Sequence, residues 1–287
     1  MSETQNVKHI NTLLHIDPEI KWNCDYFDNG QAELRVVRLW KDTTRPTVPL
    51  VFVPGWASTI FTWRYFLPRL LCYTSIFYFE TREKSSSILC PSASFKVEDV
   101  ARDVSDYLNK YYHKGTYNLI GASMGATYIL ECWAYLRNKP ACVTLILPNI
   151  AVAVPSYLSA LKYTPRRLSP YLKPFVSYLM VKFHLTPKEA EQQVGLFAAV
   201  NDGDADKLRR AGLGLGKYEL DLNEIMKIDR PSLIIGASQD RLHNPDAVLK
   251  IHQSIFGSTY KDLNTFTNAH SSKSADLIIN WMSSYNG

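Results

Sequence analysis

One short string of residues has the spacing of a catalytic nucleophile. The string Gly121-Ala122-Ser123-Met124-Gly125 matches Gly-x-Ser-x-Gly, in which a serine occupies a sharp turn between a strand and a helix. An apolar run precedes it, and a largely apolar stretch at residues 124–136 follows it. Gly121 and Gly125 are expected because side chains there would collide with the neighbouring strand and helix. The pattern therefore predicts that Ser123 is a nucleophile.

A serine nucleophile needs a base to take its proton and an acid to orient that base. In this class of turn the acid and then the histidine follow the serine along the chain. Asp240 comes after the apolar run 232–235 and before an Asn-Pro helix start, so we predict that it is the acid. His270 lies in a loop between an expected last strand and the last helix. We predict His270 as the base and keep His243 as the alternative.

Attack on a carbonyl also requires hydrogen-bond donors for the oxygen that becomes negatively charged. The amide of Met124, directly after the serine, is one expected donor. The second is expected in the turn after the apolar run 48–53, where Gly55 permits a close turn. The amide of Trp56 would then point at the substrate oxygen.

Elements that could position these groups alternate along the chain. Near-continuous apolar runs, typical of strands buried on both faces, occupy residues 48–53, 74–79, 117–120, 142–147 and 232–235. An outer antiparallel strand is expected at 32–40 and a last strand at 263–266, while helical patterns occupy 97–111, 124–136, 244–255 and 272–283. This alternation predicts an α/β fold with a mostly parallel, doubly wound sheet of about eight strands.

Residues 151–226 interrupt the alternation, with helix signals and no strand signal. We predict a helical cap at 151–226, inserted into one core domain formed by residues 1–150 and 227–287. Such an insertion would lie over the carboxyl ends of the strands, where open α/β sheets bind ligands. Its aromatic and aliphatic residues favour a substrate with an apolar moiety.

The composition excludes several other classes. Charged residues make up 21% of the chain, with a net charge of +5, and both signs are interspersed, so we expect no nucleic-acid partner. The five cysteines form no Cys-x-x-Cys pair, which argues against a zinc site or disulfide framework and favours the cytoplasm. No apolar run is long enough to span a bilayer. We expect a small-molecule ester or acyl substrate and neither cofactor nor metal; the sequence predicts no oligomeric state.

Taken together, the string Val51-Phe52-Val53-Pro54-Gly55-Trp56, the Ser123 turn, Asp240 and His270 resemble the α/β-hydrolase superfamily over about residues 30–287. The resemblance implies the α/β-hydrolase fold with a helical cap, in a serine-nucleophile, carboxylesterase-like branch.

Two positions depart from the pattern of that superfamily. Pro54-Gly55 stands where the oxyanion loop usually has His-Gly, which removes an imidazole behind the loop. Glu80-Thr81-Arg82-Glu83 stands where the family usually has Asp-x-Arg-Gly. Both departures indicate a divergent branch.

The predicted chemistry is hydrolysis of a carboxylic ester or thioester through an acyl-enzyme. Ser123 would attack the carbonyl carbon, His270 would take the serine proton, and Asp240 would hold the histidine. Acyl transfer or cleavage of a carbon–carbon bond would use the same triad. A protein of another class, a non-catalytic hydrolase fold that binds a ligand or partner, is the remaining alternative.

Overall fold

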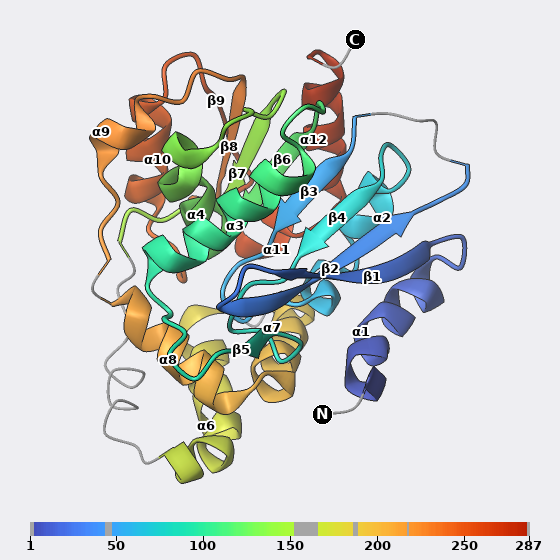
Figure 1. Ribbon diagram of the computed structural model, residues 1–287, viewed down its shortest axis with the longest axis vertical. Coiled ribbons are helices and arrows are strands. Elements are labelled where there is room, and N and C mark those ends of the chain that lie inside the picture. The colour runs from blue at the N-terminus through green and yellow to red at the C-terminus, as the bar shows by residue number, and fades with distance from the viewer. Residues whose placement is uncertain (1–2, 44–47, 152–165, 186–188, 217, 286–287) are drawn as a thin grey trace.

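The computed structural model describes residues 3–43, 48–151, 166–185, 189–216 and 218–285. Within them a nine-stranded sheet has the order β1-β2-β4-β3-β6-β7-β8-β9, and β5 pairs with β2 (Figure 1). The strands are β1 (Lys21–Asp28), β2 (Ala32–Trp40), β3 (Leu50–Val53), β4 (Ile76–Phe79), β5 (Ile88–Leu89), β6 (Asn118–Ala122), β7 (Val143–Ile146), β8 (Ser232–Gly236) and β9 (Thr259–Asp262). The strands from β4 to β9 along this order are parallel, whereas β1, β2 and β5 pair antiparallel. The predicted α/β class and mostly parallel sheet are confirmed.

Helices cover both faces of the sheet (Figure 1). They are α1 (Glu3–Ile16), α2 (Leu67–Leu70), α3 (Val97–Tyr111), α4 (Met124–Cys132), α6 (Ser169–His184), α7 (Ala190–Asp202), α8 (Ala205–Leu215), α9 (Leu222–Ile225), α10 (Pro245–Ser254), α11 (Phe266–Ala269) and α12 (Ser272–Ser283), with 3-10 turns η1 (Ile60–Trp63), η2 (Trp133–Tyr135) and η4 (Arg166–Leu168). Side chains of α3, α4 and α10 pack on one face. Those of α1, α2 and α12 pack on the other. The sheet is therefore doubly wound.

The central strand β3 shows why an apolar run without alternation marks such a sheet. Leu50 and Phe52 point into the core on the α12 side, and Val51 and Val53 point into the core on the α4 side. All four side chains are fully buried. Because successive side chains of a strand point to opposite faces, a strand covered on both faces is apolar at every position.

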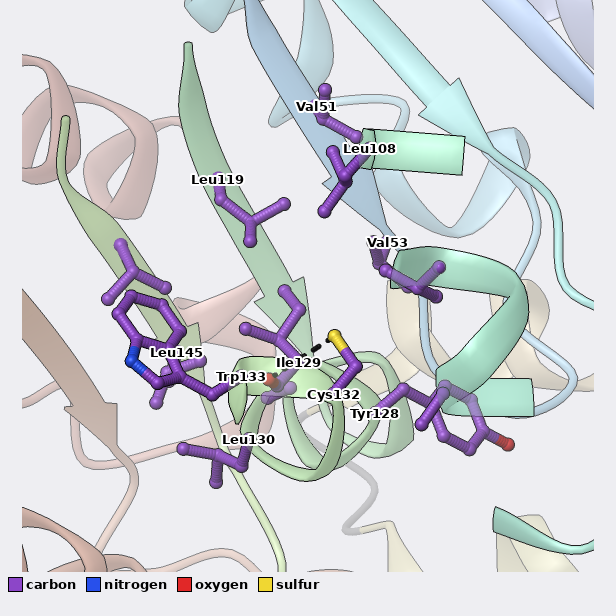
Figure 2. Packing of buried hydrophobic residues seen from close by; sticks show 14 of the residues in the cluster. Val51, Val53, Leu108, Leu119, Tyr128, Ile129, Leu130, Cys132, Trp133 and Leu145 are labelled. Carbon is purple, nitrogen blue, oxygen red and sulfur yellow. Dashed lines mark hydrogen bonds between the residues drawn. The ribbon is translucent and has the colours of Figure 1, made fainter. Parts of the chain in front are cut away.

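Helix α4 packs firmly against the sheet and begins directly after the Ser123 turn. Figure 2 shows Ile129 of α4 and Trp133 of η2 lying toward Leu119 and Leu145 of the neighbouring strands. These four side chains belong to one core cluster and are at most 1% exposed. Truncating a buried leucine such as Leu119 to alanine costs about 2–5 kcal/mol in comparable cores. This packing gives the start of α4 a rigid support.

The last strand differs from its prediction. It was expected at 263–266, but β9 ends at Asp262. Asn264 has a φ of 65°, and the side chain of Thr265 caps α11 by accepting the amide of Asn268. The chain therefore turns and begins a short helix where a strand was expected. Residues 263–266 read Leu-Asn-Thr-Phe, and the threonine before Phe266 begins a helix where the strand was expected to continue.

The segment between β7 and β8 is helical where the structure describes it. It contains α6 to α9, and among its described residues an isolated bridge joins Ala151 to Glu219. Residues 152–165, 186–188 and 217 of this segment lie outside the described residues. Figure 1 shows α6, α7 and α8 together beyond the end of the sheet to which the β3 and β4 arrows point. None of the described helices is long and apolar enough to cross a membrane.

Candidate active site

Ser123 lies on the turn between β6 and α4 and has a φ of 51° and a ψ of −119°. Such a backbone conformation is strained for a residue with a side chain and commonly occurs at functional sites. Both flanking glycines are required by close contacts. A Cβ at Gly121 would lie 2.6 Å from the Cα of Ala126, and a Cβ at Gly125 would lie 2.0 Å from the carbonyl oxygen of Val53.

The hydroxyl of Ser123 is hydrogen-bonded to a histidine, and this histidine is His243. The distance from Ser123 Oγ to His243 Nε2 is 2.8 Å. On the other side of the ring, His243 Nδ1 lies 2.7 Å from Oδ2 of Asp240. Because a carboxylate only accepts, Nδ1 carries the proton and Nε2 accepts the serine hydroxyl. The three groups form a continuous chain of hydrogen bonds.

The loop after β8 creates this geometry locally. Oδ1 of Asp240 accepts the amides of Leu242 at 2.7 Å and His243 at 3.3 Å. This tight turn folds the chain back, so that the imidazole three residues later reaches the second carboxylate oxygen. Asn244 then caps α10 by accepting the amide of Asp246. The sequence signal for the Asp240–His243 pair is therefore an aspartate that caps its own loop, followed three residues later by a histidine.

His270 is not the partner of Ser123, contrary to the prediction. Its Nδ1 donates to the carbonyl of Phe266 at 2.9 Å, and the rings of Trp63 and Phe266 each lie 4.2 Å from its ring, centroid to centroid. No hydrogen bond joins it to Ser123 or Asp240 within the described residues. The physical reason is the early end of β9, because the turn of α11 tucks this imidazole into the interior.

The environment sets the charge of these groups. Burial lowers the pKa of His270 to about 4, and the hydrogen bond to the Phe266 carbonyl opposes this shift only in part. Burial alone would raise the pKa of Asp240, but the electrostatic interaction with the His243 imidazole and the hydrogen bonds from this ring and from two amides hold that pKa below its usual range. His270 is therefore neutral near pH 7, whereas Asp240 is ionised.

Two amides are available for a substrate oxygen. Among the described residues neither the amide of Trp56 nor that of Met124 donates a hydrogen bond. Met124 is the first residue of α4, where the helix dipole favours negative charge. Gly55 brings the other loop close, because a Cβ there would lie 3.0 Å from Ser123 Cβ.

A cavity opens beside Ser123. It is lined by Gly55, Trp56, Ala57, Ser58, Thr62, Trp63, Ala122, Ser123, Ile146, Leu147, Gln192, Leu196, Ala199, Leu242, His243, Phe266 and His270. Helix α7 contributes Gln192, Leu196 and Ala199, so the inserted helices form one wall. Trp56 also lines a second cavity, which lies among α6, α7 and α8.

Nothing in the described part of the chain gathers three or more metal-binding side chains into one cluster. The groups at the site are those of proton transfer and nucleophilic attack.

Comparisons with known proteins found similar structures but no similar sequence. No family model and no curated protein matches the sequence. Solved structures do match. A hydrolase from Pseudomonas aeruginosa has a TM-score of 0.75 and 14% identity, covering 92% of this chain and 98% of its own. An esterase from Thermogutta terrifontis has a TM-score of 0.70 and 15% identity, covering 93% and 100%.

An enol-lactonase from Burkholderia xenovorans also matches, with a TM-score of 0.72 and 17% identity, covering 90% of this chain and 100% of its own. These structures are α/β-hydrolases, and each covers 90% or more of this chain. The chain therefore has the α/β-hydrolase fold.

Proposed function

We propose that this protein is a serine hydrolase that cleaves a carboxylic ester or thioester, with Ser123, His243 and Asp240 as its catalytic triad. The observation that carries the proposal is the continuous pair of hydrogen bonds, 2.8 Å from serine to histidine and 2.7 Å from histidine to aspartate. Structural neighbours named as an esterase and an enol-lactonase support ester chemistry. This assignment replaces His270 with His243 as the base.

The proposed reaction has two halves. Oγ of Ser123 attacks the carbonyl carbon while Nε2 of His243 takes the hydroxyl proton, and Asp240 stabilises the imidazolium that results. The tetrahedral intermediate collapses as the histidine gives its proton to the leaving alcohol or thiol, which leaves an acyl-serine. His243 then takes a proton from water as the water oxygen attacks the acyl carbon. The second tetrahedral intermediate collapses as His243 gives that proton to Oγ of Ser123, which releases the acid product and restores the serine hydroxyl.

The amides of Trp56 and Met124 are proposed as the oxyanion donors. Neither amide donates to another acceptor among the described residues. Met124 directly follows Ser123, and Trp56 directly follows Gly55, which packs against Ser123. Donors of this kind act most strongly on the transition state, because the carbonyl oxygen becomes negative only there.

The apolar part of the substrate is proposed to lie beneath the inserted helices. We propose that residues 151–226 form a cap on a core of residues 1–150 and 227–287, and that the protein acts in the cytoplasm. The second cavity is lined mainly by apolar side chains of α6, α7 and α8, such as Val176, Val200 and Leu208. Trp56 lines both this cavity and the one beside Ser123, so we propose that an acyl or alcohol chain reaches the second cavity past this residue.

A fluorophosphonate probe and p-nitrophenyl esters test the proposal. Wild type should react covalently with the probe and hydrolyse the esters, whereas Ser123→Ala should do neither. His243→Ala should lower kcat by about 10³–10⁶-fold, and His270→Phe should retain most of the activity. Loss of activity in His270→Phe with full activity in His243→Ala would reverse the two histidines. Absence of labelling in wild type would favour the ligand-binding alternative.

A further inference from the structure

Lys84 makes a buried contact that the triad does not explain. The residue is 7% exposed, and its Nζ donates a hydrogen bond of 2.8 Å to the carbonyl oxygen of Gly55. The same ammonium donates to Oε1 of Glu83 at 2.6 Å, and Glu83 is 1% exposed. A charged donor is thus held on the loop that follows β3.

The Gly55–Trp56 peptide bond transmits this contact to the site. The described chain contains no cis peptide bond, so the carbonyl and the amide of this peptide point in opposite directions. An ammonium on the oxygen side fixes the plane of the peptide and leaves the Trp56 N–H directed away from Lys84. Gly55 packs against Ser123, and Trp56 lines the catalytic cavity.

We propose that Lys84 is a positioning residue for the oxyanion hole, which fixes and polarises the Gly55–Trp56 peptide so that the Trp56 amide binds the developing oxyanion more strongly. The inference rests on the proposed function. Hydrogen bonds in a low-dielectric interior polarise one another, and a charged donor on the carbonyl makes the amide at the other end of the peptide a stronger donor. The benefit grows with the charge on the substrate oxygen, so it acts on kcat more than on KM.

The backbone of Lys84 is itself held by an inserted helix. Nζ of Lys207 in α8 donates to the carbonyl of Lys84 at 3.1 Å and to the carbonyl of Ser87 at 2.5 Å. The hydroxyl of Ser87 also donates to the Lys84 carbonyl, at 2.8 Å. In addition, the loop lacks the imidazole of the usual His-Gly, because Pro54 precedes Gly55. Lys84 therefore supports this loop from a different segment of the chain.

Substitution of Lys84 by methionine tests the role. Lys84→Met should lower kcat by about 10–100-fold, which is less than the loss of about 10²–10³-fold expected when an oxyanion donor itself is removed, with KM changed by less than about threefold. The affinity for an aryl trifluoromethyl ketone, which forms a tetrahedral adduct with the serine, should fall by the same factor as kcat. Lys84→Gln, a neutral donor, should fall between wild type and Lys84→Met. Lys139→Met is the matched control, because Lys139 also donates to a backbone carbonyl, that of Trp133, far from the site.

A second variant guards against misfolding, since Lys84→Met leaves Glu83 buried without its ammonium. The double variant Glu83→Gln, Lys84→Met removes both charges and should show the same loss of kcat and ketone affinity. The inference would be overturned if a folded variant kept both kcat and ketone affinity within about twofold of wild type. A change in KM alone would also overturn it. Full turnover in Ser123→Ala would instead overturn the proposed function, so the two failures are distinguishable.

Discussion

His270 makes the free energy of unfolding depend on pH in a way that can be calculated. Burial lowers its pKa from 6.5 to about 4 in the folded chain. Between these pH values the unfolded chain binds a proton that the folded chain does not bind, so the free energy of unfolding falls as the pH falls. One such group contributes about 1.4 kcal/mol per pH unit, which gives a loss of about 3 kcal/mol across the window. Below pH 4 both states bind the proton, and this contribution stops growing.

His270→Phe removes this titration and keeps an aromatic ring between Trp63 and Phe266. At pH 7 the variant should lose about 1–2 kcal/mol, because the Phe266 carbonyl loses its donor. As the pH is lowered from 7 to 4.5, wild type should lose about 2–3 kcal/mol more than the variant, so the difference between them narrows or reverses. Urea unfolding followed by circular dichroism, at several pH values and constant ionic strength, measures both curves.

The matched control for this experiment is His113→Gln, which removes an imidazole at an exposed position. Its curve should run parallel to that of wild type. If the curves of unfolding free energy against pH for wild type and His270→Phe also ran parallel from pH 7 to 4.5, His270 would not be a buried neutral group. The electrostatic argument against His270 as the base would then fail.

Three other changes have defined outcomes. Asp240→Asn should lower kcat by about 10³–10⁴-fold with unchanged circular dichroism, since an amide facing the ring favours the wrong tautomer; near-full turnover would contradict the triad. Gly212→Leu should lower kcat/KM for long p-nitrophenyl esters more than for p-nitrophenyl acetate. A Cβ there would lie 3.7 Å from the Trp56 ring, and the added atoms enter the second cavity. An unchanged dependence of kcat/KM on chain length would exclude that cavity as the binding site of the apolar chain. Arg82→Met should lower the free energy of unfolding, measured in urea, by about 3–5 kcal/mol, since it leaves the buried carboxylate of Asp103 without the guanidinium of its ion pair. A loss below about 1 kcal/mol would contradict this expectation.

Much of the fold could be predicted from the sequence because it depends on local patterns. Apolar runs predicted five of the six parallel strands, all except β9. The outer strand at 32–40 was predicted with the bounds that β2 has. Gly121 and Gly125 predicted the sharp turn, because no other residue fits so close to its neighbours. The strand at Lys21–Asp28 and the helix at Glu3–Ile16 were not predicted, since the sequence there has neither a continuous apolar run nor a strong apolar stripe.

The choice of histidine was decided by the tertiary structure. The sequence determined that a serine on a strained turn would be followed by Asp240 and by two candidate imidazoles, His243 and His270. Which imidazole reaches the hydroxyl depends on two features: how tightly the loop after Asp240 turns, and where β9 ends. Local hydrogen bonds make both turns. Only packing between distant segments brings Ser123 beside His243 and places the ring of Trp63 against His270.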